Sequence, residues 1–260
     1  MELRPVSDAA LARSIADEAG ALLRDIRAKA TCSDRELGQR GDREANMLII
    51  DRLRAARPDD FILSEESLDD RARCAARRVW IIDPLDGTRE YSERLDDWAV
   101  HIGLAIDGVP ATGAVALPAC GRTFATDDTA PLPALPSGRP RMVVSRTRAP
   151  EIATLVAGEI GADLVPMGSA GAKAMAVVAG DAEIYLHDGG QYEWDNCAPA
   201  AVAMAAGFHA SRIDGSPLVY NCIDPLLPDL LICRPEWAAP VLAAIARLRP
   251  AQGPEQSQQS

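Results

Sequence analysis

Apolar side chains recur every three or four positions near the N-terminus of the chain. Through residues 7–29 this spacing places alanine, isoleucine and leucine side chains on one face, which is the pattern of an amphipathic helix. Ser7 or Asp8 precedes the first periodic residues and can accept a hydrogen bond from a free N–H group of the first turn. The pattern therefore predicts a long first helix with one of these two residues as its N-cap.

A second helical pattern covers residues 42–57, and Pro58 ends it because proline cannot donate the next backbone hydrogen bond. Residues 31–41, between the two predicted helices, are polar and show no regular spacing, so we predict an irregular connection there. Asp42 stands where this connection would end. One interpretation gives it only the role of an N-cap for the helix that begins at Arg43.

Short apolar runs in the first half of the chain predict buried strands. Residues 61–63 and 79–82 are two such runs, and carboxylates follow each of them. Residues 100–106 and 113–117 predict two more strands, joined by a turn at residues 107–108, where aspartate precedes glycine. The first half is therefore expected to contain a sheet as well as two helices.

Residues 127–141 contain four prolines and little periodicity, which predicts a boundary between two subdomains. Strands and helices alternate beyond it, and this alternation predicts mixed α/β layers. We therefore expect an N-terminal α+β subdomain at 1–135, a C-terminal α/β subdomain at 136–250 and a disordered, Gln- and Ser-rich tail at 251–260. The elements expected in the second half are strands at 142–144, 164–165, 182–186 and 230–233, and helices at 150–161, 172–180, 195–206 and 240–248.

Composition narrows the classes of protein that fit. The net charge of −11 argues against a nucleic-acid surface, and the basic cluster Arg71, Arg73, Arg77 and Arg78 is interpreted as a solvated segment because Asp69 and Asp70 precede it. The chain has no apolar run long enough for a membrane helix and no stretch of signal-peptide type, so we expect a cytoplasmic location. Its 6 cysteines form no CxxC pair, which favours buried, reduced thiols over disulfides or zinc.

Carboxylates gather where two of the predicted strands end. Glu65 follows the strand at 61–63, and the run from Asp83 through Pro84, Leu85 and Asp86 to Gly87 and Thr88 follows the strand at 79–82. Active sites of open sheets lie at such ends, and converging carboxylates repel one another unless a hard divalent cation such as Mg²⁺ or Ca²⁺ lies between them. The alternative is an Asx turn with a solvated second aspartate. Gly87 and Thr88 could offer backbone N–H groups and a hydroxyl to a phosphate, or form only a turn.

The run Asp83-Pro84-Leu85-Asp86-Gly87-Thr88 resembles the DP(I/L)DG(S/T) signature of the inositol monophosphatase superfamily. Three more segments resemble that family in the same order: residues 63–67, 168–185 and 193–199, the last reading Glu-Trp-Asp-Asn-Cys-Ala-Pro. The likeness runs from about residue 10 to about residue 235. It implies an α-β-α-β-α sandwich, a small phosphorylated substrate, two or three Mg²⁺ ions, inhibition by lithium and a homodimer.

Within the superfamily the sequence is most similar to the CysQ-type nucleotidases, on residues 63–67, 143–146 and 193–195. This likeness implies removal of the 3′-phosphate from adenosine 3′,5′-bisphosphate (PAP), the nucleotide by-product of sulfate activation, with the related sulfate-bearing nucleotide (PAPS) as a further substrate. Two alternatives stay open: hydrolysis of inositol monophosphate or fructose 1,6-bisphosphate at the same site, and a non-catalytic metal- or phosphate-binding regulator.

The resemblance also implies a role for individual residues. The stretch between Lys29 and Asp42 departs from the family's pattern, whereas the other positions match it. The implied metal ligands are Glu65, Asp83, the Leu85 carbonyl, Asp86 and Asp195. The implied catalytic residues are Asp42, Glu65 and Thr88, which would position or activate the water. The implied substrate contacts are Glu65, Leu85, Asp86, Gly87, Thr88, Ser145, Arg146, Ser169, Lys173 and Asp195.

For several positions a structural role is the competing interpretation. Asp195 could simply be the N-cap of the helix predicted at 195–206. Lys173 could be an exposed residue of the helix predicted at 172–180. Trp194 is interpreted as a core residue. His101, His187 and His209 show no spacing typical of metal ligands, so we interpret them as structural or surface residues.

Overall fold

The computed structural model describes residues 6–128 and 131–249, so the expectation for the tail at 251–260 lies outside the described residues. The first helix, α1 (Asp8–Lys29), begins as predicted, because the Ser7 side chain accepts a hydrogen bond from the N–H of Ala10. Its apolar face is buried against the first sheet. The periodic spacing thus identifies both the helix and the face that packs.

The second helix, α2, spans Asp34–Ala56, so the prediction of an irregular segment at 31–41 is wrong. Ser33 and Glu36 start this helix with a reciprocal capping box, in which the Ser33 side chain accepts from the Glu36 N–H and the Glu36 carboxylate accepts from the Ser33 N–H. The glycine and arginine content of this segment obscures its buried face, which includes Leu37 and Gly41. Asp42 consequently lies two turns inside the helix, and its interpretation as an N-cap is also wrong.

The first sheet has the order β1-β2-β3-β4-β5, and β1 pairs in parallel with β2 while the other neighbours are antiparallel. The predicted hairpin is present as β3 and β4, which are joined at residues 107–108. Among the described strands of the first sheet, β5 is the one that the sequence pattern did not predict. The elements are β1 (Phe61–Ser64), η1 (Arg71–Ala75), β2 (Arg78–Asp86), α3 (Thr88–Ser92), β3 (Ala99–Ile106), β4 (Val109–Leu117), η2 (Pro118–Cys120) and β5 (Arg122–Ala125).

The second sheet has the order β7-β6-β8-β10-β9, with β7, β6 and β8 parallel and the other two neighbours antiparallel. Helix α7 begins at Pro235 rather than at the predicted residue 240, because Pro235 occupies the first helical position, where no N–H is needed. The elements are β6 (Arg141–Ser145), α4 (Glu151–Ile160), β7 (Asp163–Met167), α5 (Ala170–Ala179), β8 (Ile184–Tyr192), α6 (Glu193–Ala205), β9 (His209–Ser211), β10 (Leu226–Cys233) and α7 (Pro235–Leu248).

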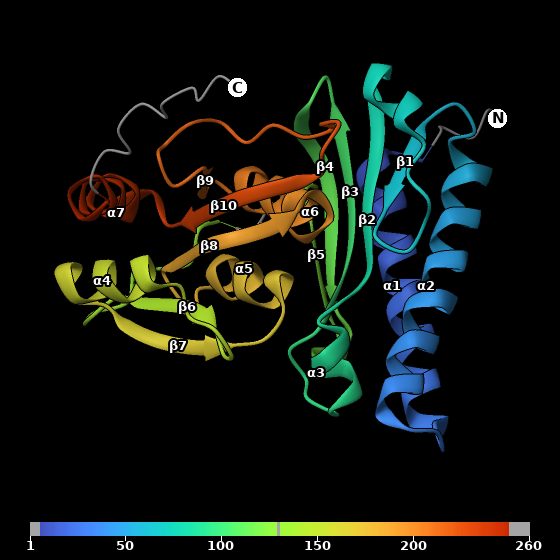
Figure 1. The fold of residues 1–260 in the computed structure, drawn as a ribbon, viewed down its shortest axis with the longest axis horizontal. Coiled ribbons are helices and arrows are strands. Elements are labelled where there is room, and N and C mark those ends of the chain that lie inside the picture. Colours follow the sequence, from blue (N-terminus) through green and yellow to red (C-terminus); the bar gives the residue numbers. More distant parts are fainter. Residues whose placement is uncertain (1–5, 129–130, 250–260) are drawn as a thin grey trace, which may run out of the picture.

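Helices and sheets alternate as five layers (Figure 1). Helices α1 and α2 cover the outer face of the first sheet, α5 and α6 lie between the two sheets, and α4 and α7 cover the outer face of the second sheet. Three hydrophobic clusters fill the spaces between these layers. The predicted α-β-α-β-α sandwich is therefore confirmed, while the subdomain boundary at 135/136 stays a prediction.

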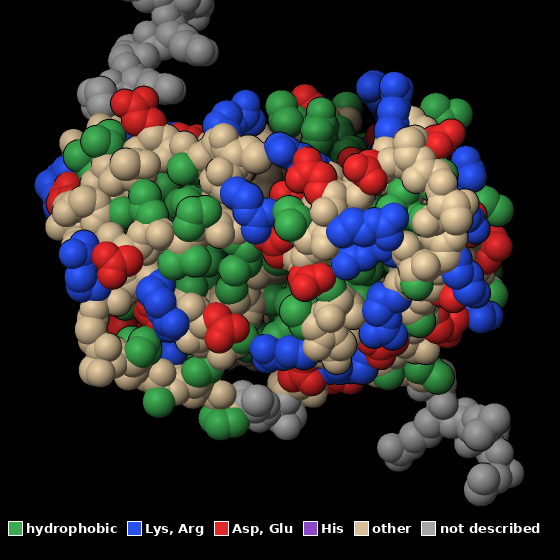
Figure 2. All heavy atoms as spheres, turned by 90° about the horizontal axis from the view of Figure 1, so that it is seen from below, with side chains coloured by type: hydrophobic (Ala, Val, Ile, Leu, Met, Phe, Trp, Pro, Cys, Tyr) green, Lys and Arg blue, Asp and Glu red, His purple; other side chains and the backbone are tan. Residues whose placement is uncertain are grey.

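Two other sequence interpretations need correction. Arg73 is not solvated: its side chain is fully buried, paired with Asp69 and donating to the Asn221 side chain. Of the six cysteines, all of them free, only Cys197 and Cys233 are buried. No helix in the described ranges combines the length and apolarity that crossing a bilayer requires. On the face drawn in Figure 2, basic and acidic side chains are interspersed rather than gathered by sign.

Candidate active site between the two sheets

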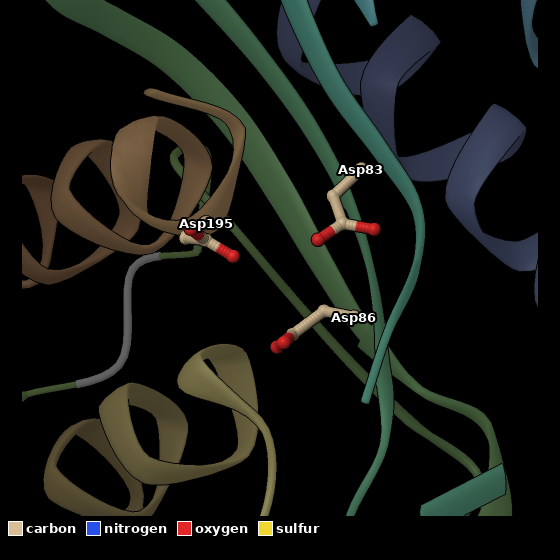
Figure 3. A group of neighbouring side chains, drawn as sticks. All are labelled: Asp83, Asp86 and Asp195. Atoms are coloured by element: carbon tan, nitrogen blue, oxygen red, sulfur yellow. The ribbon is translucent and has the colours of Figure 1, made fainter. Parts of the chain in front are cut away.

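Three aspartates converge where β2 ends. Asp83 and Asp86 come from β2 and Asp195 from the first turn of α6, and each offers an oxygen atom within 4.8 Å of the other two (Figure 3). The register between β2 and β3 shifts between Asp83 and Asp86, and the Asp83 carboxylate accepts the Leu85 N–H at 3.0 Å. An Asx turn therefore does exist here, and it directs the carboxylates toward one another instead of leaving the second one in solvent.

Asp86 is tied to the second half of the chain. Its carboxylate accepts the backbone N–H groups of Ala170 (3.1 Å) and Gly171 (2.6 Å) at the N-terminus of α5. The helix dipole and these two donors favour the ionised form. Burial raises the pKa of Asp86, but His101 and the Gly171 N–H outweigh this effect, and the pKa lies below its usual value. This contact joins the two sheets at the site.

His101 is a site residue that sequence reasoning missed, because its spacing along the chain gives no signal. It pairs with Asp83 in the β2–β3 register, its Nε2 lies 3.1 Å from the Asp86 carboxylate, and its Nδ1 lies 3.0 Å from the Trp194 carbonyl. A carbonyl oxygen only accepts, so Nδ1 carries a proton. Burial disfavours the charged ring, but Asp86 outweighs it and raises the pKa of His101. A Cβ at Gly171 would lie 2.1 Å from Nε2, so the close approach requires glycine.

The remaining carboxylates are poorly neutralised. Burial and repulsion from Asp86 raise the pKa of Asp195 to about 6, because the Tyr192 N–H, His101 and Lys173 compensate only in part. Burial and then Glu65 raise the pKa of Asp83 well above its usual range. An oxygen-only set of buried carboxylates that resist ionisation is the environment that a hard divalent cation relieves. The donor set therefore fits the metal dependence that the sequence predicts.

Glu65 lies at the edge of this site. Its backbone N–H donates to the Ile82 carbonyl at 3.4 Å, which brings it beside Asp83, although it is outside the compact group of three aspartates. The residue retains exposed surface. Desolvation by its surroundings, followed by repulsion from Asp195 and Glu66, raises the pKa of Glu65 to about 7. At neutral pH this carboxyl group is therefore divided between its two protonation states.

Asp42, Leu85 and Thr88 also meet. The Thr88 hydroxyl lies 3.1 Å from the Leu85 carbonyl and 3.4 Å from the Asp42 carboxylate. It has one proton, so it donates to one of them at a time, and its oxygen can still accept a hydrogen bond. Burial, followed by repulsion from Glu66 and Glu65, raises the pKa of Asp42 to about 8. The structure thus brings together Asp42 and Thr88, which lie on different helices.

Gly87 and Thr88 start the short helix α3. Gly87 has a φ of 86°, in the left-handed region that favours glycine, and it occupies the N-cap position of α3. It is therefore a turn residue, and the turn exposes the first N–H groups of the helix beside Asp86.

The turn before α5 carries two of the predicted substrate contacts. Ser169 caps α5 by accepting the Ala172 N–H at 2.9 Å. Lys173 is only 5% exposed, so its interpretation as an exposed helix residue is wrong. Its amine donates to the Gly168 carbonyl and, at 2.7 Å, to the Ser169 carbonyl, and it lies over the Tyr185 ring. The lysine thus holds the turn that brings α5 to Asp86.

Asp195 and Trp194 lie in the first turn of α6, which begins at Glu193, two residues before the predicted start. Asp195 is not the N-cap. Its Oδ2 accepts the Tyr192 N–H at 2.6 Å, which leaves the other oxygen directed at the aspartate cluster. Trp194 stacks on the Tyr192 ring and packs against the core between the sheets, as predicted.

Ser145 and Arg146 lie at the end of β6. Arg146 donates to Asp97 at 2.5 Å and lies 3.6 Å from Glu90, so acidic groups of the first half already occupy its guanidinium. The Ser145 hydroxyl is 3.4 Å from that of Thr147. His187 is half-buried in the first half of β8, and His209 lies on β9, where its ring contacts the Ser211 hydroxyl.

The model of the inositol monophosphatase family matches residues 5–131 and 136–247. The chain belongs to this family. It is 52% identical over 256 residues to the 3′-phosphoadenosine 5′-phosphate phosphatase of Mycobacterium leprae, covering 93% of this chain and 94% of that protein. It is 30% identical over 191 residues to the 3′(2′),5′-bisphosphate nucleotidase CysQ of Escherichia coli, covering 69% of this chain and 78% of that one.

The fold of this chain is also similar to that of a solved structure from the same family. The structure of CysQ from Bacteroides thetaiotaomicron superimposes with a TM-score of 0.74 at 26% identity, covering 87% of this chain and 97% of that one. Inositol monophosphatases are metal-dependent, and the cluster of Asp83, Asp86 and Asp195 suits that dependence.

Proposed function

We propose that this chain is a Mg²⁺-dependent phosphomonoesterase that removes the 3′-phosphate of PAP to give AMP and free phosphate. The observation that carries the proposal is the convergence of Asp83, Asp86 and Asp195 within 4.8 Å. The relative at 52% identity is named for this substrate and is matched over almost its whole length. The proposed cellular task is removal of PAP in sulfur assimilation.

The proposed metal ligands are the carboxylates of Glu65, Asp83, Asp86 and Asp195, with the Leu85 carbonyl. All are oxygen donors, which Mg²⁺ prefers. Two or three ions held there would neutralise charge on the phosphate and make an attacking water more acidic. The cations would also explain how a chain with a net charge of −11 accepts a polyanion.

The proposed role of Asp42, Glu65 and Thr88 is to hold the attacking water and take its proton. Burial and neighbouring carboxylates raise the pKa of Asp42 to about 8 and that of Glu65 to about 7 in the metal-free protein. Cations bound beside these carboxylates would lower both pKa values, which would leave the carboxylates ionised and able to accept a proton near neutral pH. The Thr88 oxygen can accept a hydrogen bond from the water, which aligns it. The water oxygen bonds to phosphorus, the bond to the 3′-oxygen breaks, and that oxygen takes up a proton.

The proposed substrate contacts lie around this centre. Gly87 and Thr88 would offer N–H groups and a hydroxyl to the reacting phosphate. Ser169, at the N-terminus of α5, would lie near the ribose, with Lys173 holding its turn. Ser145 and Arg146 would lie on the side of the second sheet.

Release of free phosphate from competing substrates tests the proposal. We expect PAP to have a higher kcat/KM than inositol 1-phosphate or fructose 1,6-bisphosphate, with PAPS as the only close competitor. A higher kcat/KM for inositol 1-phosphate or fructose 1,6-bisphosphate than for PAP would overturn the substrate assignment, while the family membership would still hold.

From the family likeness we also propose a homodimer and inhibition by lithium. Size-exclusion chromatography with light scattering tests the first, and phosphate release with increasing lithium at constant ionic strength tests the second. A monomer, or full activity at high lithium, would contradict the corresponding proposal.

A further inference from the structure

A polar cavity lies where the end of α1 meets the loop that follows α3. Arg24 and Arg27 come from the last two turns of α1, and Arg94 comes from the loop. These three arginines, Asp96, Trp98 and two alanines line a cavity of about 270 Å³. The end of α1 and helix α3 lie on the same side of the molecule (Figure 1). No member of the aspartate cluster and none of the proposed substrate contacts lines this cavity.

The cavity is positively charged although the chain as a whole is negative. Arg24 and Arg94 form no ion pair among the described residues. Arg27 lies 3.2 Å from the Asp96 carboxylate, but the Asp96 side chain is 77% exposed, so water screens this pair. Three guanidinium groups against one carboxylate leave a formal charge of +2 in a chain whose net charge is −11. The cavity is therefore a local exception that would attract an anion.

Backbone carbonyls hold the three guanidinium groups without neutralising them. Arg24 donates to the Pro118 carbonyl at 3.2 Å. Arg94 donates to the Arg27 carbonyl at 2.7 Å, and Arg27 donates to the Leu95 carbonyl at 2.6 Å. Each guanidinium has further N–H groups, and a carbonyl carries no net charge. The cations are therefore fixed in place before any ligand arrives, which reduces the entropy lost on binding.

Trp98 supplies a buried donor that lacks a partner. Its side chain is fully buried, and its Nε1–H has no acceptor among the described residues, although Trp98 lines the cavity. The guanidinium carbon of Arg27 lies 5.5 Å from the centre of the Trp98 ring, so the indole lies beside one of the cations. A buried N–H without an acceptor is costly, and an anion in the cavity would offer it one.

We propose that this cavity binds inorganic phosphate, with the three arginines as its cations and the Trp98 N–H as a further donor. Guanidinium groups suit a tetrahedral oxyanion because their planar N–H donors match two of its oxygens. A water molecule takes about 30 Å³ of liquid, so the cavity has room for the anion and several waters. Phosphate keeps an O–H group at neutral pH that can donate to the Asp96 carboxylate, whereas sulfate has none. The cavity should therefore prefer phosphate over sulfate.

Isothermal titration calorimetry of the metal-free protein with inorganic phosphate tests the site, with chloride keeping the ionic strength constant. Without metal the aspartate cluster repels phosphate, so it does not compete for the anion. Arg24→Ala and Arg94→Gly should each weaken phosphate binding by about ten- to hundredfold, the usual range for lost hydrogen bonds to a charged group. Arg94 has a φ of 63°, in the left-handed region that favours glycine, so Arg94→Gly keeps the backbone conformation. Trp98→Phe, which keeps a ring but lacks the N–H, should weaken binding by about fivefold.

Arg89→Ala is the matched control, since Arg89 is exposed on α3, pairs with Glu93 and does not line the cavity. It should bind phosphate as tightly as wild type. No phosphate binding by the metal-free wild type, unchanged affinity in Arg24→Ala and Arg94→Gly, or sulfate binding as tight as that of phosphate would overturn the proposal. These measurements involve no turnover, so none of these outcomes affects the proposed function. Wild-type protein that binds phosphate here but does not hydrolyse PAP with Mg²⁺ would overturn only the proposed function.

Discussion

The ends of the two sheets contribute opposite chemistry to one site. The first sheet ends in Asp83 and Asp86, with Glu65 beside them, and most of this charge is not neutralised by the protein. The second sheet ends in hydroxyl, guanidinium and backbone N–H groups, and α5 directs two of those N–H groups at Asp86. In the proposed function, the first sheet holds the cations and the second sheet contacts the parts of the substrate that do not react.

The most severe test of this division removes one charge from the acidic side. Asp83→Asn should lower kcat/KM for PAP by at least about a hundredfold, since even residues that only support metal ligands commonly cost ten- to hundredfold. The metal-free variant should be at least as stable as wild type, because a buried, repelled carboxylate is gone. Phosphate release and thermal unfolding measure both effects.

Asp59→Asn is a suitable control for that variant, because Asp59 is exposed in the turn before β1. It should behave as wild type in both measurements. Near-normal turnover in Asp83→Asn would contradict the placement of the site, and metal binding without turnover in the wild type would favour the regulator alternative.

The second test changes pH and metal together. The folded-state pKa values of Asp42 (about 8), Glu65 (about 7) and Asp195 (about 6) all exceed those expected in the unfolded chain. The folded, metal-free protein therefore binds more protons than the unfolded chain between about pH 4 and pH 8, so its stability should fall as the pH rises through this window.

Magnesium should reverse this loss by replacing the protons. We expect it to raise the melting temperature more at pH 8 than at pH 5, with a stabilisation of about 2.7 kcal/mol at a hundredfold excess over Kd. Thermal unfolding with chelator and with Mg²⁺ at each pH measures the difference. A magnesium effect that is equal at both pH values would contradict the assignment of these carboxylates.

The third test addresses the second sheet. Lys173→Met removes the buried amine that binds the Gly168 and Ser169 carbonyls, so it should cost about 1–3 kcal/mol of stability and loosen the turn at Asp86. Lys29→Met removes the only other lysine, which is exposed on α1, and should cost little. Chemical denaturation measures both variants, and equal stabilities would show that the buried amine has no special role.

The smallest expected effect lies outside both sheets. Ser33→Ala removes the N-cap of α2 and should cost about 1 kcal/mol. Ser14→Ala, on the exposed surface of α1, should be nearly neutral. If Ser33→Ala loses no more activity than folded fraction, the start of α2 affects Asp42 only through the stability of the fold. A larger loss of activity would show that the start of α2 also sets the position of Asp42 in the site.

Local patterns predicted most of the elements and failed where long-range packing decides. The hairpin of β3 and β4 and the start of β2 follow from residues close in sequence, whereas β2 continues to Asp86, beyond the predicted end at residue 82. Helix α2 was placed eight residues late because its first turns carry glycine and charge, yet the capping box at Ser33 was present as a signal. Strands β5 and β9 are short, and each depends on one neighbouring strand for its pairing.

By itself the sequence determined the types of groups at the site: the aspartate run at 83–88, the glutamate before it and Asp195 far beyond it. Only the tertiary structure decided which of their charges are neutralised by neighbouring groups. The register between β2 and β3 brings His101 to Asp86, and the packing of α5 buries the Lys173 side chain. Arg146 forms an ion pair with Asp97, whereas Arg148 forms no ion pair among the described residues. Charge balance in a buried site depends on distances between segments far apart in the chain, and no local pattern encodes those distances.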